Sequence, residues 1–259
     1  LSHTLEHSLI KDFNHEMMSL AIMKELNQEM NGELDTAIAI FTNQYKKKFL
    51  HQLISSQLDL DRLDYLSRDS FFTGVSEGRI GINRILKTMR VHKGNIVIEK
   101  KGIYAIENYI IARRLMYMQV YLHKTVLSAD ALIRSVFRRV RDLLDSGSEL
   151  NFASESLRYF MQDQPSAKKQ LTKKMISAYT QLDDYDIYLN IKFWTQSNDK
   201  ILSELCTRFL NRSLFRTTFF EQEPTAQHRE DIHQKTKLAL KKLSLPYGDE
   251  AAAYFYSFD

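Results

Sequence analysis

The chain has 259 residues, a formal net charge of +4 and a hydrophobic fraction of 44%, which is enough to bury a sizeable core. Eight Gly and three Pro leave little room for an all-β fold, and the aromatic fraction of 11% excludes a disordered chain. Cys206 is the single cysteine, which excludes an internal disulfide and favours a reducing cytoplasm. The sequence contains no apolar run of about 18 residues, the length that would predict a membrane-spanning helix.

Helical periodicity dominates the first half of the chain. An apolar stripe predicts a helix over residues 8–30, and residues 34–57 predict two helices around a run of three lysines. Two more helices are predicted at 60–69 and 82–89, on either side of a loop with three glycines. Alternating residues then predict a small β-hairpin at about 90–106.

The second half is also predicted to be helical, with a lobe boundary at residues 145–149. The predicted helices are 107–144, 152–161, 166–184, 198–210 and 225–243. Residues 213–222 and the tail after residue 245 are expected to add strands. The prediction is therefore a mainly α fold, with a core at 1–145 and a mostly helical lobe at 146–259.

An acidic stretch, SSQLDLDRLDYLSRDSFFTGV, stands out at residues 55–75. Asp59 is placed to cap a helix, and Asp64 and Arg68 are spaced to pair on its surface. Asp61, Tyr65 and Asp69 recur every fourth residue and share one helix face. Those three, together with Arg62, have no structural task that the spacing predicts.

A second helix face carries basic and aromatic residues in ARRLMYMQVYLHK. Arg113, Tyr117, Tyr121 and Lys124 lie on one side of a continuous helix. Arginine binds phosphate oxygens with a fork of donors, and tyrosine offers a stacking face with a hydroxyl. The face could follow a phosphate chain to a sugar and base, or it could be a half-buried face with solvated basic ends.

The start of the chain contains His3, Glu6 and His7 in the order H-x-x-E-H. Two imidazoles four residues apart on a helix can chelate zinc, with the glutamate as a general base of a peptidase. The motif is short and occurs by chance, so a polar helix face is the favoured explanation.

Five segments in this order resemble the HD-domain phosphohydrolases: SHTLEH, HEMMSL, the acidic stretch, ARRLMYMQVYLHKTV and NRSLFRT. The resemblance is strongest to the deoxynucleoside triphosphate triphosphohydrolases, which include dGTPase-like proteins and those with SAM and HD domains. It covers most of the chain and implies a mainly α fold: a helical HD-domain core with the small hairpin, and a helical C-terminal lobe.

The resemblance implies a divalent metal (Mn, Mg, Fe, Ni or Zn) held by a histidine, a His-Asp pair and a distant aspartate. Asp61 matches the distant aspartate, and the other three ligands have no match in this sequence. The chain begins without Met and inside a motif, so we expect those ligands in a preceding segment. His3 matches the catalytic histidine, Glu6 its acidic partner and His15 an assisting histidine.

The resemblance also assigns substrate and effector contacts. It places Arg62 and Arg113 on the triphosphate, Tyr65 and Asp69 on the 3′-hydroxyl, and Tyr121 under the sugar, where it disfavours a ribose. Tyr117 replaces a histidine near the base. Effector phosphates would bind at residues that match the regulatory site of the family, namely His123, Lys124, Arg212, Leu214 and Arg216.

The expected function is hydrolysis of dNTPs to deoxynucleoside and triphosphate in the cytoplasm, by a homo-oligomer that does not bind membranes. Deoxynucleoside triphosphates are the expected substrates, and their action as effectors is left open. One alternative is an HD-type hydrolase of other nucleotides or phosphoesters. Another is a protein that binds single-stranded nucleic acid through basic stretches at 137–142 and 167–174. The zinc peptidase is the least favoured.

Overall fold

The computed structural model describes residues 13–163 and 171–258, which form two compact units. One unit comprises residues 19–123, and the other comprises the described residues before residue 19 and after residue 123. Within the described ranges, no helix is both long enough and apolar enough to span a membrane. The predicted division into 1–145 and 146–259 stays a prediction about domains.

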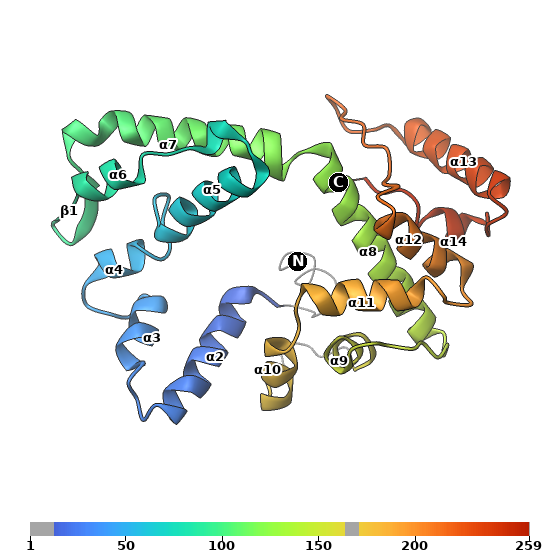
Figure 1. Ribbon diagram of the computed structural model, residues 1–259, viewed down its shortest axis with the longest axis horizontal. Helices are drawn as coiled ribbons and strands as arrows, with labels where there is room; N and C mark the ends of the chain where they lie inside the picture. Colours follow the sequence, from blue (N-terminus) through green and yellow to red (C-terminus); the bar gives the residue numbers. More distant parts are fainter. Residues whose placement is uncertain (1–12, 164–170, 259) are drawn as a thin grey trace. The chain divides into compact units, whose positions relative to one another are not determined.

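The unit of residues 19–123 is helical, with one two-stranded hairpin (Figure 1). Helix α2 crosses its boundary at the N-terminal side. The elements are α2 (His15–Glu29), α3 (Asp35–Phe41), α4 (Lys48–Gln52), α5 (Leu60–Thr73), η1 (Ser76–Gly78), α6 (Ile82–Thr88), β1 (Met89–His92), β2 (Asn95–Ile98), η2 (Lys100–Gly102), α7 (Ile103–Met116) and the π-helical segment η3 (Tyr117–Tyr121).

The unit that contains residues 124–259 is helical in its described part. Its elements are α8 (Lys124–Asp145), α9 (Glu155–Gln162), α10 (Lys173–Thr180), α11 (Asp184–Trp194), α12 (Lys200–Leu210), α13 (Ala226–Lys242) and α14 (Asp249–Ala252). Helix α8 packs against α12, and its buried face includes Leu132, Val136 and Val140. The predicted mainly α fold is confirmed.

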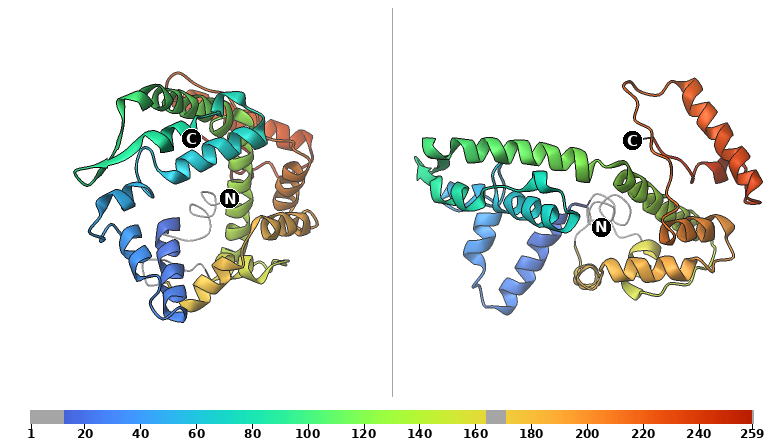
Figure 2. Two further views of the ribbon diagram at one scale, coloured as in Figure 1. Left: turned by 60° about the vertical axis from the view of Figure 1, so that its left-hand side comes forward. Right: turned by 45° about the horizontal axis from the view of Figure 1, so that its top comes forward.

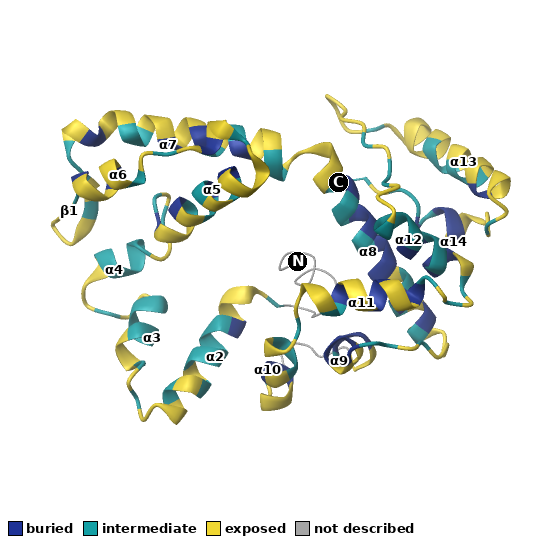
Figure 3. Cartoon of the chain, in the orientation of Figure 1, coloured by how far each residue is buried: buried dark blue, intermediate teal, exposed yellow. Residues whose placement is uncertain are grey.

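The core of the unit of residues 19–123 lies between α5, α6 and α7, which run beside one another in Figures 1 and 2. Leu66, Ile85 and Met116 are its fully buried members, with Leu63 and Tyr109 beside them. Figure 3 shows these inward faces as the dark-blue patches of the three helices. This core fixes the distance between α5 and the C-terminal end of α7.

The hairpin is shorter than predicted. Its antiparallel register pairs Met89 with Ile98, and its turn places Lys93 and Gly94 at positive φ. The predicted span of 90–106 was wrong at its end, because Ile103 already begins α7. The alternation of residues 103–106 resembles a strand, but packing against the core selects a helix.

The predicted continuous helix of 107–144 was also wrong. It is divided into α7, η3 and α8, with Leu122 and His123 outside the helices. The backbone N–H of Leu122 donates to the carbonyl of Tyr117 at 2.8 Å, which is the wider i to i+5 bond of a π-helix. The sequence gives no Gly or Pro at this break, so its periodicity could not reveal it.

Three predictions for the last third of the chain need correction. Helix α11 was missed; it begins with a capping box of Asp183 and Asp186 and buries Ile191. Residues 213–222 form no strand, although the Ser128 hydroxyl holds this segment by donating to the carbonyl of Phe215 at 2.7 Å. The described tail likewise adds the short helix α14 rather than a strand.

Candidate functional site

The acidic stretch folds as predicted into α5. The Asp59 carboxylate caps the helix by accepting from the backbone N–H of Arg62 at 2.8 Å, and Gly74 ends it at φ 73°. Leu63 and Leu66 face the core. Asp64 and Arg68 form the predicted ion pair on the exposed side, so a surface contact accounts for two of the charges of α5.

Helix α5 meets the π-helical segment through a hydrogen bond. The hydroxyl of Tyr121 donates to Oδ2 of Asp69 at 2.6 Å. The ring of Tyr121 also contacts Tyr65 and Tyr117 edge to face, with centroid distances of 5.9 Å and 5.3 Å. The π-helix therefore places Tyr121 against the acidic face of α5, with Tyr117 in contact with Tyr121, and π-helical segments often accompany functional sites.

Tyr121 is held in its neutral form. Burial raises the pKa of its phenol, and the hydrogen bond to Asp69 and the charge of that carboxylate raise it further. The phenol therefore stays a hydrogen-bond donor at neutral pH. A carboxylate accepts on both oxygens, so Asp69 can accept from Tyr121 and from a ligand hydroxyl at the same time.

Two arginines lie along the same site. Nε of Arg62 donates to the carbonyl of Ser56 at 2.9 Å and lies 3.1 Å from the Asp59 carboxylate. Burial disfavours its charge, but the hydrogen bond with Tyr65 and the Asp59 charge keep the pKa of Arg62 above its usual value. Both guanidinium groups are half-buried and charged, and the guanidinium of Arg113 lies 5.9 Å from the ring centroid of Tyr117.

Two members of this cluster were missed from the sequence. Gln57 accepts from Arg113 at 3.0 Å through its side chain and from the Tyr109 hydroxyl at 2.7 Å through its carbonyl. Tyr109 could have been found, because it extends the four-residue spacing of Arg113 and Tyr117 by one step. Gln57 precedes α5 in irregular chain, where periodicity carries no signal.

Asp61 stands apart from these contacts. Its side chain is exposed near the start of α5, and it makes no hydrogen bond or ion pair with another described residue. Within residues 13–163 and 171–258, no group of three His, Cys, Asp or Glu side chains is arranged to hold a metal ion. The described residues thus supply one carboxylate, which does not by itself form a transition-metal site.

The predicted catalytic residues are mostly untested. His3 and Glu6, and His7 of the peptidase motif, lie outside the described residues. His15 is exposed at the first position of α2. It belongs to a different compact unit from the one that contains α5. The catalytic role of these histidines therefore stays a prediction.

The structure brings part of the predicted effector set together. The hydroxyl of Thr217 donates to the carbonyl of Lys124 at 3.0 Å, which joins the start of α8 to the segment of Leu214 and Arg216. Arg212 follows α12 at φ 54°. His123 is the last residue of the other compact unit, so its place beside the remaining residues stays a prediction.

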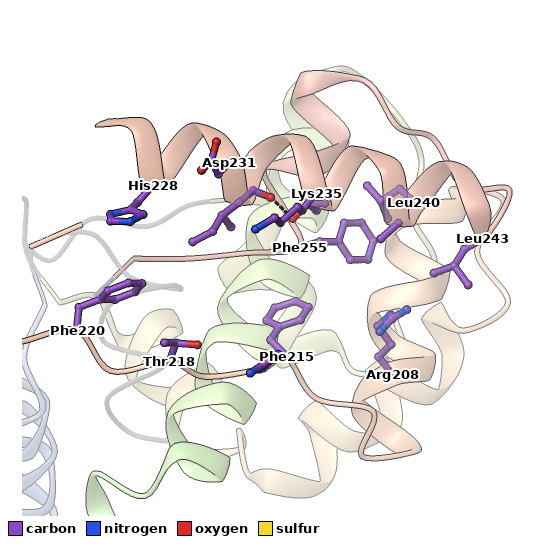
Figure 4. A pocket seen from close by; sticks show the side chains of 14 residues that line it. Arg208, Phe215, Thr218, Phe220, His228, Asp231, Lys235, Leu240, Leu243 and Phe255 are labelled. Atoms are coloured by element: carbon purple, nitrogen blue, oxygen red, sulfur yellow. Dashed lines mark hydrogen bonds between the residues drawn. The ribbon is translucent and has the colours of Figure 1, made fainter. Parts of the chain in front are cut away.

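Arg216 also lines a cavity of about 700 Å³ between residues 208–220 and α13 (Figure 4). Phe215, Phe220 and Phe255 give it apolar walls, and Arg208 and Lys235 add two further cations. The cavity lies within the unit of residues 124–259 and does not include any residue of α5 or α7.

The basic stretches have structural partners. Arg139 forms a forked ion pair with Asp199 at 2.6 Å and 3.0 Å, and Arg138 donates to the carbonyl of Ala253. In the second stretch, Lys174 lies 3.5 Å from Asp163, and part of the stretch lies outside the described residues. The structure therefore gives these arginines a role in packing α8, and the nucleic-acid alternative stays untested.

Comparisons with known proteins relate the chain to one group. Residues 80–175 match the family model described as "HD associated region". The uncharacterized protein YwfO of Bacillus subtilis is 35% identical over 223 residues, which cover 83% of this chain and 49% of YwfO. A deoxynucleoside triphosphate triphosphohydrolase SAMHD1 homolog of Dictyostelium discoideum is 22% identical over 74% of this chain and 40% of its own.

The fold has a close counterpart among solved structures. The crystal structure of a phosphohydrolase from Bacteroides thetaiotaomicron superposes with a TM-score of 0.91 at 42% identity, covering 98% of this chain and 62% of that chain. The chain spans about half the length, or less, of the curated relatives that it matches. Residues 80–175 thus correspond to an HD-associated region, and the chain is related to the HD-domain phosphohydrolases.

Proposed function

We propose that the protein is a phosphohydrolase that splits deoxynucleoside triphosphates into deoxynucleoside and triphosphate. The observation that carries the proposal is the cluster of Asp69, Tyr65 and Tyr121 next to Arg62 and Arg113. A carboxylate that accepts from one tyrosine and shares a helix face with another suits a sugar hydroxyl, and two half-buried guanidinium groups suit a phosphate chain. The name of the Bacteroides relative supports a phosphohydrolase, and the name of the Dictyostelium relative supports action on deoxynucleoside triphosphates.

The proposed roles divide along the substrate. Arg62 and Arg113 would bind the triphosphate and stabilise the negative charge that develops on the α-phosphoryl oxygens as water adds to the phosphorus. The free oxygen of Asp69 would accept from the 3′-hydroxyl beside Tyr65. The ring of Tyr121, fixed by its bond to Asp69, would leave no room for a 2′-hydroxyl, and Tyr117 would lie near the base.

The proposed reaction is a hydrolysis at the α-phosphorus. A water oxygen would bond to that phosphorus, the bond from phosphorus to the 5′-oxygen would break, and the departing oxygen would take a proton. His3, with Glu6 and His15, is the proposed acid and base set. A divalent metal would need ligands beyond Asp61, so no step is assigned to it.

The experiment that tests this reaction uses the longest natural form of the chain with Mn²⁺ or Mg²⁺. The four dNTPs are supplied singly and mixed, and the products are separated by anion exchange. Deoxynucleoside and intact triphosphate are the expected products; turnover only in mixtures would add an effector site at Lys124 and Arg216. Release of pyrophosphate or of single phosphate, or no product, would reject the proposal.

A pair of arginine variants tests the binding roles. Arg113→Ala should lower kcat/KM by about 100-fold, because a charge-assisted bidentate contact to phosphate is lost. Arg68→Ala is the matched control on the exposed side of α5, where the side chain pairs with Asp64, and it should leave kcat/KM within about twofold. Equal effects from the two variants would contradict the assignment of Arg113.

A further inference from the structure

The loop between α4 and α5 is closed by its own hydrogen bonds. The backbone N–H of Leu60 donates to the carbonyl of Leu53 at 2.9 Å, which joins the two ends of the loop. Inside it, the backbone N–H of Ser56 donates to Oδ2 of Asp59 at 3.1 Å. We refer to residues 53–59 as the α5 loop. Its ends are close together and its backbone is bonded internally, as in other compact surface loops.

The α5 loop contacts both arginines of the candidate site. Nε of Arg62, in α5, donates to the carbonyl of Ser56 at 2.9 Å. Nη1 of Arg113, in α7, donates to Oε1 of Gln57 at 3.0 Å. The two acceptors belong to consecutive residues. One short segment therefore orients two guanidinium groups that come from different helices.

The backbone of Gln57 is anchored to the core. Its carbonyl accepts from the hydroxyl of Tyr109 at 2.7 Å, and Tyr109 is a buried member of the core between α5, α6 and α7. Burial raises the pKa of this phenol, so it remains a donor at neutral pH. Tyr109 precedes Arg113 by four residues, or about one helical turn. The side chain of Gln57 thus starts from a fixed point one turn away from Arg113.

The side chain of Gln57 has one partner among the described residues, and that partner is Arg113. The amide is neutral, so it orients the guanidinium without adding a negative charge to the site. A guanidinium has five N–H donors, and one bond to an amide leaves others for a phosphate. A carboxylate in the place of the amide would instead form an ion pair with Arg113 and repel an anionic ligand.

We propose that Gln57 is a positioning residue, which holds Arg113 in the orientation that binds the phosphate chain and leaves its charge to the ligand. This inference rests on the proposed function, because it takes the phosphate contact of Arg113 from there. Holding a long side chain in place before binding reduces the conformational entropy that binding would otherwise cost. Arg62 is held instead by the Ser56 carbonyl and the Asp59 carboxylate.

The first test measures the binding of inorganic triphosphate to the longest natural form by titration calorimetry with Mg²⁺ present. Gln57→Met keeps the length of the side chain and removes the acceptor, so Kd should rise by about fivefold. Gln57→Glu places a negative charge beside the ligand, so Kd should rise by about 20-fold. Gln28→Met is the control, at an exposed position of α2 in the same compact unit, and should leave Kd within about twofold.

Urea unfolding separates positioning from support of the fold. A glutamate pairs with Arg113 at least as well as a glutamine does, so the urea midpoint of Gln57→Glu should equal or exceed that of Gln57→Met. If Gln57 only supported the α5 loop, binding would follow the same order, and Gln57→Glu would bind triphosphate more tightly than Gln57→Met. Positioning without a competing charge predicts the reverse order for binding.

A double-mutant cycle tests whether Gln57 acts through Arg113. Arg113→Ala alone should raise Kd for inorganic triphosphate by at least about tenfold, because a charge-assisted contact is lost. Gln57→Met added to Arg113→Ala should change Kd by no more than about twofold, since no guanidinium is left to orient. If the two effects multiplied, Gln57 would act independently of Arg113, and the proposal would be overturned.

The remaining outcomes distinguish this inference from the proposed reaction. If Arg113→Ala weakened binding and Gln57→Met did not, the positioning role alone would fail. If Arg113→Ala left the binding of triphosphate unchanged, the phosphate contact assigned to Arg113 would fail, and the positioning role with it. Calorimetry does not depend on turnover, so the products formed from dNTPs report on the reaction separately.

Discussion

At the scale of single residues, the contact between Tyr121 and Asp69 defines the candidate site. Tyr121→Phe removes the hydroxyl that donates to Asp69 and should lower the free energy of unfolding by about 1 kcal/mol. Tyr121→Ala also removes a half-buried ring in contact with two tyrosines, and should cost about 2 kcal/mol more. Urea unfolding measures both changes.

The same pair of variants separates stability from specificity. Tyr121→Ala should raise the turnover of ribonucleotides relative to deoxyribonucleotides by about tenfold, because a cavity would replace the ring that we propose lies under the sugar. Tyr121→Phe keeps the ring and should keep the preference. Tyr185→Phe, at an exposed tyrosine of α11, is the control for hydroxyl removal. An unchanged preference in Tyr121→Ala would argue against a sugar contact.

Packing between elements sets the geometry of that site. A Cβ atom added to Gly78 of η1 would lie 2.5 Å from Sδ of Met116 in α7 and 2.7 Å from Cβ of Ser70 in α5. Gly78→Ala should therefore push these helices apart and lower the free energy of unfolding by about 1–3 kcal/mol.

A second glycine provides the control for this substitution. Gly248 has φ −64° and no heavy atom within 4 Å of an added Cβ. Gly248→Ala should change the free energy of unfolding by no more than about 1 kcal/mol, and in the stabilising direction. Equal losses in the two variants would mean that close packing of η1 is not the cause.

The link between α13 and α14 responds to acid. The hydrogen bond from Lys237, and then the one from His233, lowers the pKa of Asp249 to about 2. Because the folded pKa lies below the unfolded value of about 3.9, this stabilisation is present above pH 4. It is lost as the pH falls toward 2.

Urea unfolding at a series of pH values from about 5 to about 2, the range in which Asp carboxyl groups titrate, measures this effect. Asp249→Asn should remove part of the acid-induced loss of stability. Glu250→Gln, at the neighbouring position of α14, should leave it unchanged, because Glu250 has no partner among the described residues. An identical pH profile for wild type and Asp249→Asn would contradict the prediction.

At the scale of the whole molecule, the proposed metal dependence can be tested on the longest natural form. Chelation, and separately Asp61→Asn, should lower turnover by at least about 100-fold, because a metal ion stabilises transition-state charge by several kcal/mol. The fold should not respond to Asp61→Asn, since the carboxylate is exposed and unpartnered among the described residues.

A neighbouring carboxylate controls for loss of charge on α5. Asp64→Asn removes an equally exposed carboxylate that pairs with Arg68, and should leave turnover and metal content within about twofold. Full metal content and full turnover in Asp61→Asn would show that this aspartate is not a ligand.

The sequence by itself determined the mainly α class, the Asp59 cap, the Asp64–Arg68 pair and the shared face of α5. These features depend on the spacing of residues within one helix, and that spacing can be read directly from the sequence. The sequence also predicted Arg62, Tyr65, Asp69 and Tyr121 as candidate site residues.

Only the tertiary structure decided which of these residues touch. The bond between Tyr121 and Asp69 joins residues 52 positions apart, and Gln57 reaches Arg113 across 56. The π-helix at Tyr117, the early start of α7 at Ile103 and the missing strand at 213–222 were also decided there. Each depends on packing against elements distant in sequence, which local propensity does not encode.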